Sequence, residues 1–449
     1  MRDRRSRRPA RPAPSRAPRL TSTEGDARVV GGPVAVSPGR SSGPKGALLL
    51  SAGAAAAVRR GHPWVYADQV IAGLQAPAAS DERAICDDAG VPIARAIVDP
   101  ASPIAARIWS LDASRPIDDA LVAGRIERAI ALREALIDGD TTALRWVHGE
   151  GDRAPGIVID RYADVAVLRL DGEAMERWTE RIADVAWELM RPRGIRSLSL
   201  RATRRRDGRA APDAATNDPS GGEPAKLRTL RGEPPPGELV VREHGVPFVV
   251  DLARGQKTGA FLDQRDNRRR VGALSRDRRV LNLFSYAGGF SLHAALSGAR
   301  ACTSVDVAAG AHVTAQRSFH AAGVPLDPHS FVTADVWTFL ERARQRGERW
   351  DLIVSDPPNM APSAATRARA ISAYRKLHAL CAGVLADGGI LCAASCSSHV
   401  SLEDFLGTLD DAALGRSDLR VTAIAGAGVD HQTLAAFPEG RYLKFCVLG

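Results

Sequence analysis

Asn282-Leu-Phe-Ser-Tyr-Ala-Gly-Gly-Phe290 is the most informative segment of this 449-residue chain. Residues 279–285 predict a strand that runs into the two glycines, and residues 290–298 predict a helix that follows them. Gly288 and Gly289 would let the backbone come close to a ligand, and the helix N-terminus would offer free N–H groups. The G-x-G-x-x-G fingerprint of dinucleotide sites is missing. An ordinary tight turn between a strand and a helix would give the same pattern.

Strands and helices alternate from about residue 237 to the C-terminus. A hairpin is predicted at residues 240–252. Further strands are predicted, mostly with a helical segment between neighbours, at residues 301–307, 330–336, 350–358, 389–396, 419–426 and 441–449. Such alternation predicts an α/β fold with a doubly wound parallel sheet, which binds its ligand outside the carboxyl ends of the strands.

Two of these strands end in a carboxylate. Asp306 could accept hydrogen bonds from both hydroxyls of a ribose, and Asp335 could accept one from the exocyclic amine of an adenine. Each carboxylate could instead only cap the following helix. Together with the glycine turn, three successive strand ends carry suitable groups, and this favours an edge that binds a nucleoside.

The next strand ends in Ser355-Asp-Pro-Pro-Asn359. Two prolines fix φ and remove two donors, so the loop is stiff and leaves Asp356 and the carbonyl of Pro357 free to hydrogen-bond a planar base. Pro358 and Asn359 would line the same loop. A Pro-Pro turn can also exist for rigidity alone, but beside a nucleoside-binding edge it predicts methylation of a planar nitrogen heterocycle.

Cys396 follows the fifth strand, in Ser395-Cys-Ser-Ser-His399. Cytosine C5 is too weak a nucleophile to take a methyl group directly, whereas a thiolate that adds to C6 turns the ring into an enamine. Cysteine is often only a small buried apolar residue, as expected for Cys392 inside the strand. Cys396 lies beyond the strand end, so we expect it at the ligand edge as the nucleophile. His399 could shuttle a proton or be structural.

The chain divides into four parts. We expect a disordered Arg- and Pro-rich tail at 1–44, a β-rich domain at 45–112, an α+β domain at 113–236 and the α/β domain at 237–449. The α+β domain is expected to contain one helix over 116–136 with Ser114 as its N-cap, a helix over 173–190, and a final flexible insert at 203–236.

Charge and composition restrict the function classes. Met1 to Lys45 holds eleven basic and three acidic residues and so accounts for +8 of the net charge of +9, which weakens the overall charge as a sign of RNA binding. The six cysteines have no C-x-x-C spacing, so no structural zinc or other metal is expected. No apolar run reaches the ~18 residues of a membrane span. We therefore expect a cytoplasmic protein without membrane contact.

Several motifs resemble those of one known family, the class I ribosomal RNA large-subunit methyltransferases that combine a PUA domain, a small central domain and a Rossmann-like catalytic domain. The similar segments are Gly61–Tyr66, Pro155–Tyr162, Gly255–Arg265 with Asn267 and Arg268, Asn282–Ser291, Asp356–Pro358 and Ser395–Ser397. The resemblance implies a PUA-like part at 45–112, a central part at 113–236 and a catalytic part at 237–449.

The resemblance also implies a reaction and its residues. The family transfers a methyl group from S-adenosylmethionine to C5 of a cytosine in 23S ribosomal RNA, free or in an assembly intermediate, with Cys396 as nucleophile and Asp356 holding the base. The residues expected to bind S-adenosylmethionine are Lys257, Asp263, Arg265, Asn282, Phe284, Tyr286, Gly288, Gly289, Asp306 and Asp335. Pro357, Pro358 and Asn359 are expected to contact the base, although Asn359-Met360 departs from the family's basic or polar residue and Phe.

Other hypotheses remain open. The same fold with an Asp-Pro-Pro loop could methylate guanine N2 without a cysteine, and a non-catalytic RNA-binding protein could keep the fold as a relic. A nicotinamide dehydrogenase would need the missing glycine fingerprint. The sequence leaves undecided the nucleotide, the group that removes the C5 proton and the oligomeric state, for which a homodimer is one option.

Overall fold

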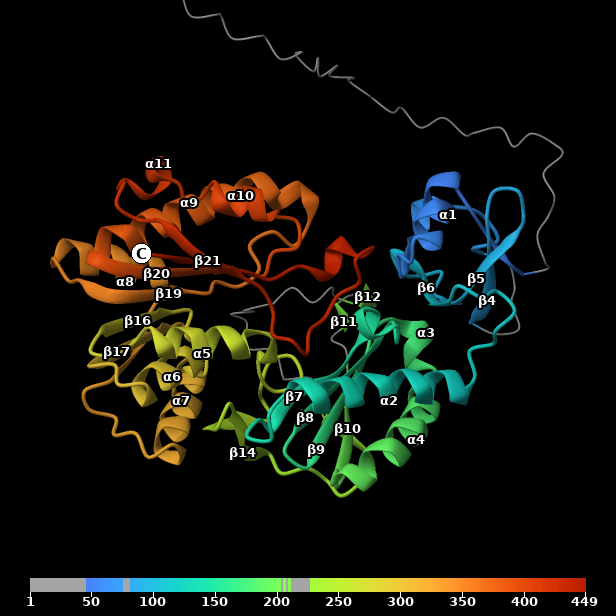
Figure 1. The fold of residues 1–449 in the computed structure, drawn as a ribbon, viewed down its shortest axis with the longest axis horizontal. Helices are drawn as coiled ribbons and strands as arrows, with labels where there is room; N and C mark the ends of the chain where they lie inside the picture. Colours follow the sequence, from blue (N-terminus) through green and yellow to red (C-terminus); the bar gives the residue numbers. More distant parts are fainter. Residues whose placement is uncertain (1–45, 76–80, 203–204, 207–208, 211–226) are drawn as a thin grey trace, which may run out of the picture. The chain divides into compact units, whose positions relative to one another are not determined.

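The computed structural model describes residues 46–75, 81–202, 205–206, 209–210 and 227–449 (Figure 1). The N-terminal tail that was expected to be disordered lies outside these residues. None of the helices in the described part is both long and apolar enough to cross a membrane.

The first sheet is formed by residues 48–110 and has the strand order β2-β6-β5-β4-β1-β3. Its elements are β1 (Leu48–Leu50), α1 (Ala52–Arg59), β2 (Trp64–Tyr66), β3 (Val70–Ala72), β4 (Glu82–Cys86), β5 (Pro92–Val98) and β6 (Ile104–Ser110). Only β1 and β4 pair in parallel among the described strands of this sheet. Helix α1 covers the sheet because its alanines and Val58 are small enough to pack on it.

A second sheet follows, with the order β13-β10-β9-β8-β7. Its elements are α2 (Asp119–Leu136), β7 (Ala143–His148), β8 (Ile157–Tyr162), β9 (Val165–Leu170), α3 (Glu173–Glu176), α4 (Thr179–Met190), β10 (Ser197–Arg201) and β13 (Leu227–Gly232). Helices α2 and α4 pack on one another and share a core with the strands, in which Ile126, Trp146 and Ile182 are fully buried. The short strands β11 (Arg205–Arg206) and β12 (Arg209–Ala210) form a separate pair.

Three sequence expectations fail in this part. The first helix begins at Asp119 rather than at residue 116, because the carboxylate of Asp118, not Ser114, accepts from the N–H of Leu121. The helix expected over 173–190 is broken into α3 and α4. The insert expected at 203–236 contains the edge strand β13, whose Arg231 pairs with Asp184 of α4 at 2.6 Å. Residues 203–204, 207–208 and 211–226 of this insert lie outside the described residues.

The predicted hairpin is present as β14 (Glu238–Glu243) and β15 (Val246–Asp251). A seven-stranded sheet follows, named the catalytic sheet below because it lies in the part of the chain that is expected to be catalytic. That sheet has the order β18-β17-β16-β19-β20-β22-β21. Its strands are β16 (Arg279–Leu283), β17 (Ala301–Asp306), β18 (Ser330–Thr333), β19 (Trp350–Ser355), β20 (Leu385–Ser395), β21 (Val421–Ala425) and β22 (Lys444–Leu448). The strands β16 to β20 are parallel, and β22 runs antiparallel to both neighbours.

Helices cover both faces of this sheet, as Figure 1 shows. On one face lie α5 (Arg265–Ala273), α6 (Gly289–Leu296) and α7 (Ala309–Ala321). On the other lie α8 (Val336–Gln345), α9 (Arg367–Val384) and the short α10 (Leu402–Leu406) and α11 (Asp411–Leu414). Strand order reverses between β16 and β19, so a ligand is expected beyond the carboxyl ends of these two strands.

Candidate active site at the carboxyl edge of the catalytic sheet

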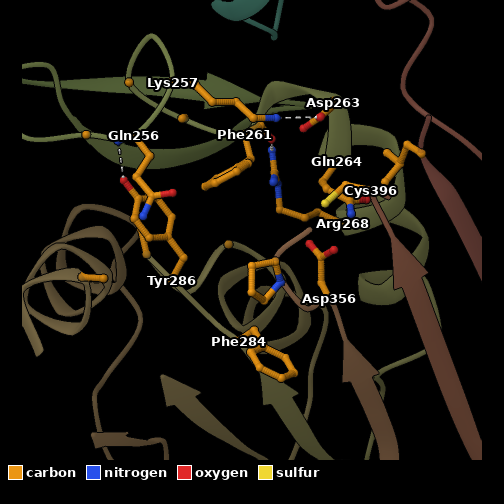
Figure 2. A pocket seen from close by; sticks show the side chains of 18 of the residues that line it. Gln256, Lys257, Phe261, Asp263, Gln264, Arg268, Phe284, Tyr286, Asp356 and Cys396 are labelled. Atoms are coloured by element: carbon orange, nitrogen blue, oxygen red, sulfur yellow. Dashed lines mark hydrogen bonds and ion pairs between the residues drawn. The ribbon is translucent and has the colours of Figure 1, made fainter. Parts of the chain in front are cut away.

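A cavity of about 830 Å³ lies at this edge. Its volume is within the range of roughly 300–1,000 Å³ that is usual for small-molecule sites. Figure 2 shows the side chains of Phe284, Tyr286, Asp356 and Cys396 around the same space. The parts of the chain at 45–112 and 113–236 also contribute lining residues, among them Trp64 and Glu150.

The loop after β16 is held in an unusual backbone conformation. Phe284 and Tyr286 have φ values of 56° and 45°, in the left-handed region that side chains other than glycine seldom occupy. The N–H of Tyr286 donates to Asp306 Oδ2 at 2.8 Å, and the N–H of Ala308 donates to Oδ1 at 2.8 Å. Strain of this kind is typical of functional sites, and here the Asp306 carboxylate at the end of β17 fixes it.

The two glycines of the loop have different surroundings. Gly288 has a φ of 72° and caps α6, and a Cβ on it would lie 2.9 Å from the Cβ of Ala315. Gly289 lines the cavity, and a Cβ there would lie 2.7 Å from Cδ of Arg268. Gly288 is therefore required for the packing of α6 against α7, and it does not itself line the cavity.

A cation and a carboxylate from the segment 255–268 face the cavity. Lys257 Nζ pairs with Asp263 Oδ2 at 2.9 Å, and the hydroxyl of Tyr442 donates to the same oxygen at 2.6 Å. Burial would raise the pKa of Asp263, but the charges of Lys257 and His431 outweigh it and hold that pKa well below its usual value. The other oxygen, Oδ1, is buried and has no hydrogen-bond partner within the described residues.

The Asp-Pro-Pro loop and the cysteine loop meet at the cavity. The Sγ of Cys396 lies 3.9 Å from the carbonyl oxygen of Pro357, to which it donates. Burial, with a further contribution from Asp263, raises the pKa of Asp356 to about 7, although the side chain of Gln264 hydrogen-bonds this carboxylate. Burial and then the charge of Asp356 raise the pKa of Cys396 to about 12, with Lys257 acting in the opposite direction.

Most of the residues expected to form the site do line the cavity. They are Lys257, Asp263, Phe284, Tyr286, Gly289, Asp306, Asp356, Pro357, Pro358, Asn359 and Cys396; Ser398 and His399 also line it.

Besides Gly288, three expected cofactor residues do not line the cavity. Asn282 is buried, and its Nδ2 donates to Ser291 Oγ at 3.0 Å. Arg265 is fully buried and pairs with Asp430 at 2.7 Å. Asp335 is the N-cap of α8 and accepts from the N–H of Thr338 at 2.9 Å, the capping alternative that the sequence left open.

Sequence reasoning missed several lining residues. Gln264 and Arg268 stand inside a quoted motif, so that motif could have pointed to them. Trp64 stands in the segment Gly61–Tyr66, but nothing in that segment pointed to the cavity, because the indole of Trp64 donates to Glu150 Oε1, at 2.8 Å, in a distant part of the chain. Tyr442 gave no signal, because its partner Asp263 is 179 residues away. Within the described residues, no three His, Cys, Asp or Glu side chains gather as metal ligands would.

The fold and this site define the class of protein. Residues 224–419 match the family model of the S-adenosylmethionine-dependent methyltransferases, and residues 48–111 match that of the PUA-like domain. The chain is an enzyme that uses S-adenosylmethionine as methyl donor, and its predicted fold class, a Rossmann-like catalytic domain preceded by a PUA-like domain, is confirmed.

Relatives with known names cover most of the chain. The ribosomal RNA large subunit methyltransferase of Deinococcus radiodurans is 38% identical over 415 residues, which are 90% of this chain and 97% of that protein. Ribosomal RNA large subunit methyltransferase I of Escherichia coli is 34% identical over 401 residues, 88% of this chain and 97% of that protein. The chain belongs to the family of these ribosomal RNA large subunit methyltransferases.

Solved structures share the fold. A candidate methyltransferase in complex with SAH has a TM-score of 0.76 and 20% identity, and the match covers 90% of this chain and 99% of that chain. A candidate S-adenosylmethionine-dependent methyltransferase from Streptococcus mutans has a TM-score of 0.75 with the same identity and coverage.

Proposed function

We propose that this enzyme methylates C5 of a cytosine in large-subunit ribosomal RNA through a covalent adduct between Cys396 and C6 of the base. The observation that carries the proposal is the contact of the Cys396 thiol with the carbonyl of Pro357, at the cavity that Asp306 and Asp356 also line. The names of the relatives support ribosomal RNA as the substrate class.

The lining residues fit S-adenosylmethionine. Asp306 stands at a strand end where a carboxylate can accept from the two ribose hydroxyls. The unpartnered Oδ1 of Asp263 is an acceptor for the ammonium group of the amino-acid end, since a buried carboxylate oxygen without a donor is costly. Lys257, its partner, offers a cation for the carboxylate at that end. When bound, S-adenosylmethionine supplies an electrophilic methyl group on its sulfonium.

The protonation of Asp356 favours cytosine as the base. With a pKa of about 7, this carboxyl group keeps its proton in a large fraction of molecules near neutral pH. A neutral carboxyl group can donate to N3 of cytosine while the carbonyl of Pro357 accepts from the N4 amine. Guanine presents donors at both N1 and N2, which an ionised carboxylate would bind better. The raised pKa therefore supports cytosine C5 over guanine N2.

Cys396 carries the covalent step. Its thiolate sulfur forms a bond to C6, and the electron pair of the C5–C6 double bond moves to C5, helped by the proton that Asp356 donates at N3. C5 would then take the methyl group as the bond from the methyl carbon to the sulfonium sulfur breaks, so that S-adenosylhomocysteine would leave, and N3 would return its proton to Asp356. Loss of the C5 proton and cleavage of the sulfur–C6 bond restore the double bond and release the thiolate, so that the cysteine is regenerated.

Product analysis tests the proposal. Purified enzyme is incubated with labelled S-adenosylmethionine and 23S ribosomal RNA, and the RNA is mapped by bisulfite sequencing and nucleoside mass spectrometry. We expect 5-methylcytosine with the wild type, at least a 1,000-fold lower rate with Cys396→Ala, and an unchanged rate with the matched control Cys392→Ala, because this second cysteine is buried inside β20. N2-methylguanosine as the product, or full activity of Cys396→Ala, would overturn the proposal.

A further inference from the structure

Lys444 is a buried cation at the turn that carries Cys396. It opens β22 and stands opposite Ser395 in the antiparallel pair of β20 and β22. Its side chain is buried, and Nζ donates to the carbonyl oxygens of Ser397 at 2.6 Å and Val400 at 2.8 Å. These two bonds tie the segment 396–400 to the sheet.

The ammonium group of Lys444 forms no ion pair with a carboxylate in the part of the chain that the structure describes. Among the ion pairs of the described residues, none includes Lys444, whereas Lys257 at the same cavity is paired with Asp263. A buried charge that is hydrogen-bonded but has no counter-charge is destabilising unless another group supplies one. Burial lowers the pKa of Lys444 to about 8. The negative charges that oppose this effect are, in decreasing order, the thiolate of Cys396, the carboxylate of Asp404 and the thiolate of Cys446.

The other groups that face Cys396 are two carboxylates, one cation and two hydroxyls. The carboxylates of Asp356, after β19, and of Asp263 disfavour a thiolate, and Lys257 favours it. The hydroxyls of Tyr442 and Tyr374 carry no charge near neutral pH. Lys257 shares its charge with Asp263, whereas the ammonium group of Lys444 donates to neutral carbonyl oxygens of the turn that follows Cys396.

We propose that Lys444 is a positioning residue that holds the 396–400 turn and supplies the positive charge that favours the thiolate form of Cys396. The proposal rests on the proposed function in so far as the thiolate is the nucleophile of methyl transfer. It predicts that removing the charge of Lys444 makes Cys396 less reactive, and that removing a neutral hydrogen bond to the same turn does not.

The test is the rate at which iodoacetamide alkylates Cys396, followed by mass spectrometry of its peptide from pH 6.5 to 10 without RNA. The other five cysteines are buried. We expect Lys444→Met to alkylate about tenfold more slowly at pH 7.5, because loss of a nearby cation that lowers the pKa of the thiol by about one unit lowers the thiolate fraction about tenfold. Lys444→Arg keeps the charge and should keep the wild-type rate at that pH. The matched control Tyr374→Phe removes the bonds to Ser395 and Ser397 without a charge and should leave the rate unchanged.

The shape of the pH profile separates charge from structure. In the wild type, the logarithm of the rate should rise with slope one and flatten near pH 8, because deprotonation of Lys444, whose pKa is about 8, removes the charge that favours the thiolate. Neither variant at position 444 has an ammonium group to titrate, so their profiles should rise without this bend.

Equal losses in Lys444→Met and Lys444→Arg, an equal loss in Tyr374→Phe, or a wild-type profile without the bend would overturn the role of the Lys444 charge. Alkylation does not require methyl transfer. A bend near pH 8 together with an absence of 5-methylcytosine would therefore refute the proposed function alone. Formation of 5-methylcytosine together with a profile without the bend would refute the role of Lys444 alone.

Discussion

Asp356→Asn should stabilise the enzyme at alkaline pH while it abolishes methylation. The pKa of Asp356 rises from 3.8 to about 7, mainly because burial disfavours its charged form. At ~1.4 kcal/mol for each tenfold change in proton affinity, this rise corresponds to about 4 kcal/mol. Asp356 is only partly buried, and solvent in the cavity screens its charge, so this figure is an upper limit and about 2 kcal/mol is the expected gain.

The sign of the pH dependence follows from linkage. Between about pH 4 and pH 7 the unfolded chain has already lost the proton of Asp356 and the folded protein still holds it, so the stability contributed by this group falls as pH rises. Asparagine has no proton to lose. The difference in free energy of unfolding between Asp356→Asn and wild type should therefore be about a quarter as large at pH 4.5 as at pH 8, where it is largest.

Urea denaturation of both proteins at pH 4.5 and pH 8, without S-adenosylmethionine or RNA, measures this difference. Asp335→Asn is the matched control, because Asp335 is exposed at the N-cap of α8 and asparagine caps a helix as well as aspartate does. A stability difference for Asp356→Asn that does not change between the two pH values would refute the reasoning, since it would show that the Asp356 carboxyl group is not perturbed by its surroundings.

Two further predictions test other parts of the site. Asp306→Ala should weaken S-adenosylmethionine binding about 10- to 100-fold in calorimetry, because hydrogen bonds to a charged acceptor contribute ~1.5–3 kcal/mol; an unchanged affinity would contradict the ribose role. Asp430→Asn should lower the free energy of unfolding by about 3–5 kcal/mol in urea, because Asp430 and its partner Arg265 are both fully buried; a loss below about 1 kcal/mol would show that the pair is not needed for folding.

The sequence predicts the catalytic sheet because each of its strands and helices is encoded by residues that are neighbours along the chain. Each of the strands β16 to β20 is a short apolar run followed by a helical pattern, and the ligand edge follows from the alternation alone. The roles of the strand-end carboxylates are less predictable. Asp306 and Asp335 occupy equivalent places in the sequence, yet Asp306 lines the cavity while Asp335 caps α8. A carboxylate at a strand end can serve either as a helix cap or as a ligand, so the pattern cannot separate the two roles.

The residues that the sequence could not predict lie mainly in the segment between β21 and β22, and there the reason is distance along the chain. Asp430 pairs with Arg265, and Tyr442 donates to Asp263 at the cavity. Glu439 accepts from the hydroxyl of Tyr66 in the PUA-like part. Partners this far apart leave no periodic signature, because each is a single polar residue in an irregular segment. The segment between β21 and β22 therefore joins parts of the chain that boundaries near residues 112 and 236 separate. A substitution in this segment should disturb the active site, although the segment carries none of the reacting groups.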